Sequence, residues 1–168
     1  MEVRIATPDD ADDIARVQQE TWRVAYAHVF PAAGLATEFI DPGRWRRNIE
    51  TPPPGWSTFV AGDPIVGFAC VGPSRDEHGV GELYAIYVHP DAWSTGAGRE
   101  LIERAEEQLV RRYDDATLWV LQENPRARRF YERAGWRHDG GRKEYERWNV
   151  RTPEIRYRKR LSSDRSRS

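Results

Sequence analysis

The chain has 168 residues, and its 26 basic and 27 acidic side chains leave a formal net charge of −1. This length fits one domain with a substantial core, and the near-neutral charge argues against a general nucleic-acid-binding surface. The sequence has no apolar run long enough to cross a bilayer and no signal-peptide pattern at its start, so we expect a cytoplasmic protein with no membrane partner. One cysteine, Cys70, excludes an internal disulfide framework and a cysteine-based metal cage.

The first part of the chain predicts a strand, two helices and a hairpin. Residues 2–6 are typical of a strand, and a helix begins after Thr7-Pro8 and reaches about Ala27. A second helix is expected over 44–49, where the prolines and glycine of 51–55 end it. Two strands, 56–61 and 65–71, follow as a hairpin. Cys70 lies in the second strand, where we expect a buried and unreactive thiol.

The most informative pattern lies in residues 82–101. A strand over 81–88 leads through a polar loop to Gly96-Ala97-Gly98, where an amphipathic helix over 98–112 begins at once. Glycines let the backbone approach a ligand closely, and the first amides of the helix point outward at the positive end of its dipole. We therefore expect a phosphate-bearing ligand at residues 94–99, with a simple helix start as the alternative.

Two common phosphate-binding motifs do not match this loop. A Walker loop needs Lys and then Ser or Thr directly after its last glycine, where Arg99-Glu100 stands. A dinucleotide fingerprint needs a third glycine at the position of Leu101, together with repeating βαβ units. The ligand is therefore expected to be of another phosphate-bearing class.

A second motif follows a buried-looking strand over 116–121. Asn124 suits a helix cap, Pro125 suits the first turn, and Gly135 suits the left-handed position that ends a helix. These residues predict a short helix over 125–133. Weaker strand signals lie at 136–139 and 154–161, and residues 162–168 are expected to form a polar tail outside a domain of residues 1–161.

With these two motifs in order, the chain resembles the GCN5-related N-acetyltransferase (GNAT) family, which transfers an acyl group from acyl-CoA to an amine. The pyrophosphate loop of that family, Gln/Arg-x-x-Gly-x-Gly/Ala, is matched by residues 93–98, although Trp93 stands at the Gln/Arg position. The family's Asn-x-x-Ala/Arg-x-x-Phe-Tyr-x-x-x-Gly-Phe segment is matched at Asn124, Phe130, Tyr131, Gly135 and Trp136.

The resemblance covers residues 3–161 and implies a single-domain α/β (α+β) fold. In this fold a central mixed, mostly antiparallel sheet is flanked by helices in the order βααβββαβαββ. It also implies acetyl-CoA as the acyl donor. The donor-binding residues it implies are Ile86, Tyr87 and Val88 along the pantetheine, Ser94, Thr95, Gly96, Ala97, Gly98 and Arg99 at the pyrophosphate, and Asn124 and Arg128.

The resemblance implies a specific role for the backbone near Val88, for Asn124 and for Arg128. A bulge near Val88 would free a backbone amide for the oxyanion. Asn124 would bind pantetheine, or serve only as the helix cap. Arg128 would reach the 3′-phosphate or adenine, or be an ordinary solvated arginine.

The chemistry needs a base and an acid. An alkylamine is mostly protonated at neutral pH, and its free form costs about 4 kcal/mol there, so the enzyme should hold a base near it. The resemblance implies that Glu82 is this base, directly or through water, with a salt bridge as the alternative. It implies that Tyr131 protonates the departing thiolate, with a plain core role as the alternative. The four histidines have no paired ligand spacing, and we expect no metal.

The acceptor side is implied to include Trp22, Tyr26, Tyr84 and residues 145–149. Trp22 and Tyr26 lie four residues apart on one helix face, where they suit an aromatic wall, core packing or a homodimer contact equally. The sequence does not identify the acceptor amine: a small amine, an antibiotic amine, an amino acid and a protein N-terminus all fit. We expect acetyl transfer to a primary amine by direct attack in a ternary complex. A non-catalytic acyl-CoA-binding sensor is the alternative.

Overall fold

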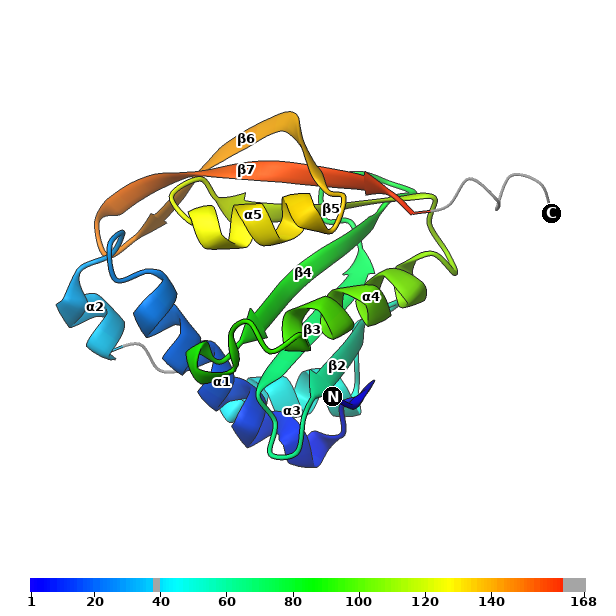
Figure 1. The fold of residues 1–168 in the computed structure, drawn as a ribbon, viewed down its shortest axis with the longest axis horizontal. Coiled ribbons are helices and arrows are strands. Elements are labelled where there is room, and N and C mark those ends of the chain that lie inside the picture. The colour runs from blue at the N-terminus through cyan, green and yellow to red at the C-terminus, as the bar shows by residue number, and fades with distance from the viewer. Residues whose placement is uncertain (38–39, 162–168) are drawn as a thin grey trace.

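Seven strands form one sheet in the computed structural model, which describes residues 1–37 and 40–161 (Figure 1). Their spatial order is β1-β2-β3-β4-β5-β7-β6, and every neighbouring pair is antiparallel except β4 and β5. The strands are β1 (Val3–Ile5), β2 (Ser57–Ala61), β3 (Gly67–Pro73), β4 (Gly81–Val88), β5 (Asp115–Leu121), β6 (Arg137–Arg147) and β7 (Val150–Arg160). The expected mixed, mostly antiparallel sheet is confirmed.

Helices cover both faces of this sheet. Ala69 and Val71 of β3 pack with α4, whereas Phe68, which points to the opposite face of the strand, packs with α1 and α3. The helices are α1 (Ala11–Ala25), α2 (Ala32–Thr37), α3 (Pro42–Glu50), α4 (Ala97–Leu109) and α5 (Pro125–Arg133), with short 3₁₀ turns at Pro8–Asp10 and Pro90–Ala92. Figure 1 shows α4 and α5 in front of the sheet, with α1 and α3 at its lower end.

The expected element order lacked one helix, α2, which the structure adds between α1 and α3. A helix of six residues is marginally stable by itself even with three alanines, and Gly34 weakens it further. Burial of Leu35 against Tyr26 and Phe30 stabilises it instead. The last two strands are also longer than expected, because the glycine pair at 140–141 forms an irregularity inside β6 rather than a connection.

The strands β4 and β5 diverge after a short parallel contact. Their pairing consists of Gly81 with Ala116 and Glu82 with Thr117. Within the described residues β4 then keeps β3 as its strand partner on one edge, and its other edge faces β5 across a gap. This divergence gives the molecule its main cavity.

A bulge in β4 lies at Tyr84, where the register with β3 shifts between the pairs Cys70–Ala85 and Val71–Leu83. We expected it near Val88, and that position was wrong. The bulged residue fits at this position because Gly72 has no side chain: a β-carbon there would lie 2.5 Å from the Tyr84 hydroxyl oxygen. The tyrosine ring packs at a tilt against Trp56, with the ring centroids 4.6 Å apart.

Two sequence expectations concern the core and the chain end. Cys70 is buried as predicted, and burial raises the pKa of its thiol to about 11, so it stays protonated and unreactive at neutral pH. The expected polar tail, residues 162–168, lies outside the described residues. In the part of the chain that the structure describes, no helix has the length and apolar character that a membrane crossing requires.

Candidate active site

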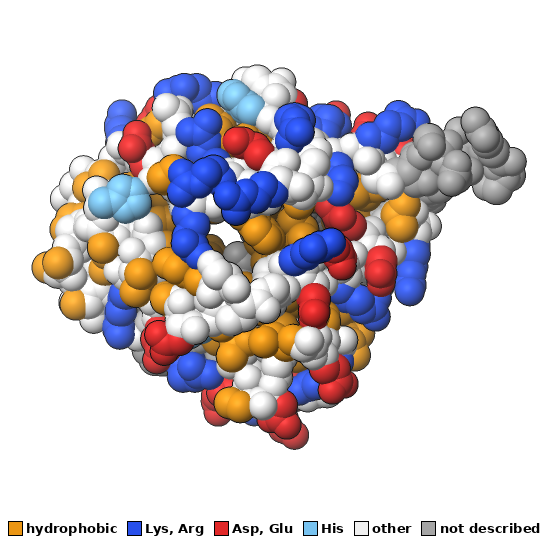
Figure 2. Space-filling view, viewed as in Figure 1, with side chains coloured by type: hydrophobic (Ala, Val, Ile, Leu, Met, Phe, Trp, Pro, Cys, Tyr) orange, Lys and Arg blue, Asp and Glu red, His pale blue; other side chains and the backbone are white. Residues whose placement is uncertain are grey.

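A cavity of about 820 Å³ occupies the gap between β4 and β5. Side chains from α1, α4, α5 and from β4 to β7 line it. Figure 2 shows Lys and Arg side chains gathered around a hollow between α5 and the start of α4. One end of the cavity is therefore basic at the place where the sequence predicts phosphate binding.

The backbone before α4 turns sharply. Gly96 caps the helix with φ of 92°, and Ser94 has φ of 64°, both in the left-handed region. The amide of Glu100 donates to the Gly96 carbonyl as the first helical bond, so by helix geometry the preceding amides need other acceptors. A β-carbon on Gly96 would meet no described atom within 4 Å, which leaves open space for a ligand.

Four of the six predicted loop residues reach the cavity wall: Ser94, Gly96, Gly98 and Arg99. The other two, Thr95 and Ala97, support the loop. The Thr95 hydroxyl donates to the Ala92 carbonyl at 2.6 Å, and Ala97 is fully buried.

Trp93 holds this loop against β4. Its indole N–H donates to the Val88 carbonyl at 2.8 Å, and the Arg126 guanidinium lies 4.0 Å from its ring centroid. Trp93 stands where the family has Gln or Arg and makes two contacts there. The bond to Val88 fixes the loop, and the ring holds Arg126 at the cavity wall.

The edge of β4 that faces the gap carries Ile86, Tyr87 and Val88, and all three line the cavity as predicted. Because β5 has diverged, this edge is placed to pair with an extended ligand in the way that a neighbouring strand would.

The helix α5 contributes a cap, a tyrosine and a row of arginines. Asn124 accepts a hydrogen bond from the Ala127 amide at 3.2 Å and also lines the cavity, so its capping role is confirmed. Arg128 turns away, donating to the Tyr157 hydroxyl and the Gln122 carbonyl. The structure therefore does not bring Arg128 to the wall.

Helix periodicity explains this difference. Positions 126, 129 and 133 share one face of α5, and position 128 lies on another. Arg126, Arg129 and Arg133 line the cavity. We did not predict these three arginines as site residues, although their spacing in the sequence places them on one helix face.

Tyr131 also lines the cavity and is buried against Phe130 and Tyr157, with ring centroids at 5.5 and 6.3 Å. Burial, reinforced by nearby Tyr87, raises the pKa of its hydroxyl above the ordinary value of 10. The phenol therefore keeps its proton at neutral pH and can donate it.

Glu82 is fully buried beneath Arg75. Its Oε1 accepts from the Arg75 amide at 3.0 Å, and its Oε2 accepts from Arg75 Nε at 3.1 Å and Nη2 at 2.5 Å. Arg75 belongs to the cavity wall, whereas Glu82 does not. The salt bridge that we weighed as the alternative is present, and the role of Glu82 as the base stays a prediction.

The three predicted acceptor residues, Trp22, Tyr26 and Tyr84, all line the cavity. Trp22 and Tyr26 meet edge to face at 4.9 Å, and the Trp22 indole donates to the Tyr87 hydroxyl at 3.1 Å. This pair also packs into a hydrophobic cluster with Phe30 and Leu35, so it belongs to both the cavity wall and the core, and its contact with the acceptor stays a prediction.

The floor on the acceptor side comes from three residues that the sequence did not reveal: Trp119, Lys143 and Glu154. They lie on β5, β6 and β7, where Lys143 pairs with Glu154, and Trp119 pairs with Arg156, two residues from Glu154 on the same face of β7. Burial raises the pKa of the Glu154 carboxyl, with Lys143 acting in the opposite direction.

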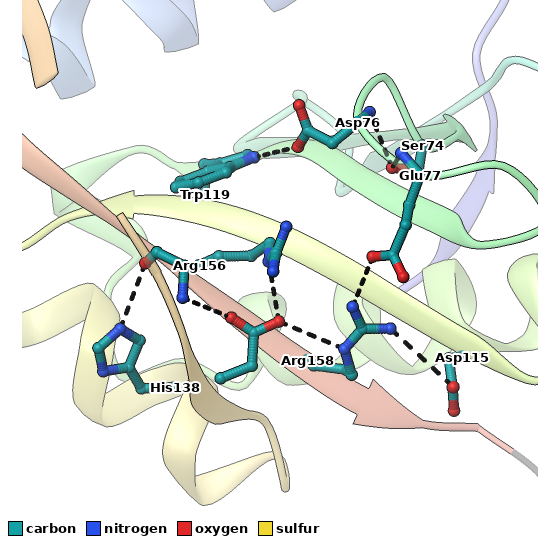
Figure 3. Close-up of polar contacts among 10 residues, drawn as sticks. Ser74, Asp76, Glu77, Asp115, Trp119, His138, Arg156 and Arg158 are labelled. Atoms are coloured by element: carbon teal, nitrogen blue, oxygen red, sulfur yellow. Dashed lines mark hydrogen bonds and ion pairs between the residues drawn. The ribbon is translucent and has the colours of Figure 1, made fainter. Parts of the chain in front are cut away.

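The loop between β3 and β4 is fixed to this floor (Figure 3). The Trp119 indole donates to Asp76 at 2.6 Å, and Arg158 donates to Glu77 at 2.5 Å. These bonds hold the loop that carries Arg75. Across residues 1–37 and 40–161, no group of three or more His, Cys, Asp or Glu side chains could hold a metal ion.

Known proteins resemble this chain in sequence and in fold. The family model described as "Acetyltransferase (GNAT) family" matches residues 12–136. The uncharacterized N-acetyltransferase YuaI of Bacillus subtilis is 35% identical over 134 residues, which is 73% of each chain.

Two solved structures have the same fold, one with acetyl-CoA bound and one with coenzyme A bound. The structure of yncA from Salmonella typhimurium with acetyl-CoA superposes with a TM-score of 0.77, at 17% identity, over 97% of this chain and 95% of that one. PaiA N-acetyltransferase from Thermoplasma acidophilum, in complex with coenzyme A, gives a TM-score of 0.71 at 16% identity, over 95% and 99%.

Proposed function

The chain belongs to the GNAT family of acetyltransferases, and from that premise we propose that it transfers the acetyl group of acetyl-CoA to a primary amine in a ternary complex. One observation carries the proposal: a single cavity connects the amides and arginines at the start of α4 with a buried phenol and an aromatic wall. Anion-binding groups, an acid and an acceptor surface therefore meet in one space.

The donor is proposed to lie along the gap between β4 and β5. Its pyrophosphate would take backbone amides of residues 94–99, where the helix dipole adds positive charge. Arg126, Arg129 and Arg133 would add charge at the same end. The pantetheine would pair with the open edge of β4, and Asn124 would bind it from the other side. This arrangement directs the thioester toward Tyr131 and the acceptor wall.

The transfer is proposed to be direct. The amine nitrogen attacks the thioester carbonyl, forming a C–N bond, and the C–S bond then breaks. The leaving thiolate takes the Tyr131 proton, and a carboxylate takes the proton that the amine loses. Cys70 cannot carry the acetyl group, because it is buried in β3 and its thiol has a raised pKa.

The competing function is a CoA sensor that binds without turnover. Calorimetry with acetyl-CoA and thiol release with a panel of primary amines separate the two. We expect binding and amine-dependent thiol release, with the product confirmed by mass. Binding without release on any amine would support the sensor, and absence of binding would overturn both.

The acceptor is best sought by stabilisation. Thermal-shift screening of amines with acetyl-CoA present should identify compounds that raise the melting temperature, since a bound ligand stabilises the folded state by mass action. Each hit then needs a product mass, because an inhibitor would also stabilise the protein.

A further inference from the structure

Lys143 places a primary ammonium group in the wall of the cavity. Its Nζ lies 3.6 Å from Oε2 of Glu154 and 4.2 Å from the ring centroid of Trp119. A carboxylate and an aromatic face are the two groups that bind an alkylammonium ion most directly in proteins. The chain's own lysine therefore occupies a site suited to a primary amine.

The carboxylate and the ring are held in place independently of Lys143. Glu154 lies on β7, paired on both sides by β5 and β6, and its side chain is 17% exposed. The Trp119 indole is bound by Asp76, as Figure 3 shows. Lys143 is 44% exposed on a flexible stem, so it is the group that can leave.

A second cation near the ring is already engaged. The Arg156 guanidinium lies 5.6 Å from the Trp119 centroid, but its Nε donates to Asp139 at 2.8 Å. Lys143 is therefore the cation whose departure would open the Trp119 face beside Glu154.

The local charges balance with Lys143 in place. Glu154 interacts electrostatically with Lys143 on β6, Arg75 in the β3–β4 loop and Glu82 on β4, and its charge in turn acts on Tyr87. The two carboxylates match the two cations. If Lys143 swings out, one negative charge is left without its cation, and an acceptor ammonium restores the balance.

We propose that Glu154 and Trp119 form the subsite that receives the acceptor as a primary alkylammonium ion, displacing Lys143, and that Glu154 then accepts its proton. This rests on the proposed acetyl transfer and names its substrate class: an amine on an unbranched aliphatic stem, as in a lysine side chain. One ammonium proton moves from nitrogen to a Glu154 carboxylate oxygen, and the neutral amine attacks the thioester. After the C–S bond breaks and the thiolate takes the Tyr131 proton, the second proton that the nitrogen loses returns to the Tyr131 phenolate. Glu82 is bound by three Arg75 donors and lies off the wall, and of the two wall carboxylates, Glu144 and Glu154, Glu154 is the one paired with Lys143.

Binding can be measured without turnover. The probe is n-butylamine hydrochloride, titrated into ¹⁵N-labelled protein while the Trp119 indole N–H signal is followed by NMR, assigned by its loss in Trp119→Phe. We expect the signal to shift on titration. Glu154→Gln should weaken binding at least tenfold, and Lys143→Met should tighten it severalfold by removing the competitor.

The matched control is Glu146→Gln. Glu146 lies on β6, is 55% exposed and pairs with Arg151. The Glu146→Gln variant should therefore bind n-butylamine with the affinity of the wild type. Unchanged affinity in Glu154→Gln, or weaker binding in Lys143→Met, overturns the subsite. Because this assay needs no acetyl transfer, it separates failure of the subsite from failure of the proposed function.

The proton-accepting step has its own readout in the pH profile of kcat/KM. Lys143 lowers the pKa of Glu154, so Lys143→Met should move the acid limb to higher pH. Glu154→Gln should remove that limb and lower kcat/KM about 100-fold. If the limb survives in Glu154→Gln and disappears in Glu82→Gln, Glu82 is the base and the assignment to Glu154 is wrong.

Discussion

The wall of the cavity at α4 is made of backbone, whereas the wall at β5, β6 and β7 is made of side chains. The first comes from one run of residues, 93–99, whose glycines leave amides and space for an anion. The second joins Trp119, Lys143 and Glu154 from three strands. A backbone site needs little buried charge, but the side-chain site holds a partly buried carboxylate, Glu154, whose ionisation opposes folding. Binding of the donor should therefore tolerate side-chain changes, and binding of the acceptor should not.

Tyr131 links the two walls, and its substitution should have the largest effect. Tyr131→Phe keeps the ring but removes the acid, so turnover should fall about 100-fold while acetyl-CoA affinity stays nearly unchanged. Steady-state kinetics and calorimetry measure both quantities. Tyr113→Phe, a partly buried tyrosine outside the cavity lining, is the control and should leave turnover unchanged.

The raised pKa of Tyr131 adds a pH prediction. A phenol whose pKa lies above 10 in the folded protein stays protonated at lower pH, so it should produce no alkaline limb in kcat below pH 10. An alkaline limb near neutrality that disappears in Tyr131→Phe would contradict the assigned acid.

The backbone wall can be broken at Gly96, with an effect of intermediate size. Valine at φ of 92° is strained by about 1–3 kcal/mol, and its side chain would enter the ligand space, so Gly96→Val should weaken acetyl-CoA binding at least tenfold. Gly79 offers a matched control, because its φ is 79° and a β-carbon there meets no described atom within 4 Å.

Gly79 lies in the loop between β3 and β4 and outside the cavity lining. Gly79→Val should lower the melting temperature by a similar amount yet leave donor affinity unchanged. Equal losses of affinity in both variants would mean that strain, rather than the ligand site, explains the effect.

The smallest expected effect is on stability, and it measures how much the partly buried Glu154 carboxylate destabilises the folded protein. Burial raises the pKa of Glu154 in the folded protein above its ordinary value of 4.5. The stabilising contribution of this group to the free energy of unfolding is therefore fully present below pH 4.5 and is lost as the pH rises through the folded-state pKa. At neutral pH the ionised group opposes folding. Glu154→Gln should thus stabilise the protein by about 1 kcal/mol or less at pH 7, and the gain should vanish near pH 4. Thermal unfolding at the two pH values measures it, and a loss of stability at pH 7 would show that the pair with Lys143 outweighs burial.

The sequence predicted the backbone wall well because its determinants are local. The glycine spacing after β4, the cap at Asn124 and the glycine after α5 each fix the conformation of a few neighbouring residues, and the structure has all three. The remaining helix, α2, was missed because its stability comes from burying Leu35 and not from its own propensity.

The side-chain wall was not predicted because its geometry depends on register. Lys143 and Glu154 meet only when β6 and β7 pair with an irregularity between His138 and Arg142, and a shift of one residue would turn them to opposite faces. The position of the bulge at Tyr84 depends likewise on the space above Gly72 across the sheet. Periodicity within one strand cannot report such cross-strand relations.

The divergence of β4 from β5 has a practical consequence for redesign. The groups proposed to hold the nucleotide lie on β4, α4 and α5, and those proposed to choose the amine lie largely on β5, β6 and β7, joined to β4 by two residue pairs. An engineer can therefore randomise positions 119, 143 and 145 to seek new amine preferences while the coenzyme cradle stays intact.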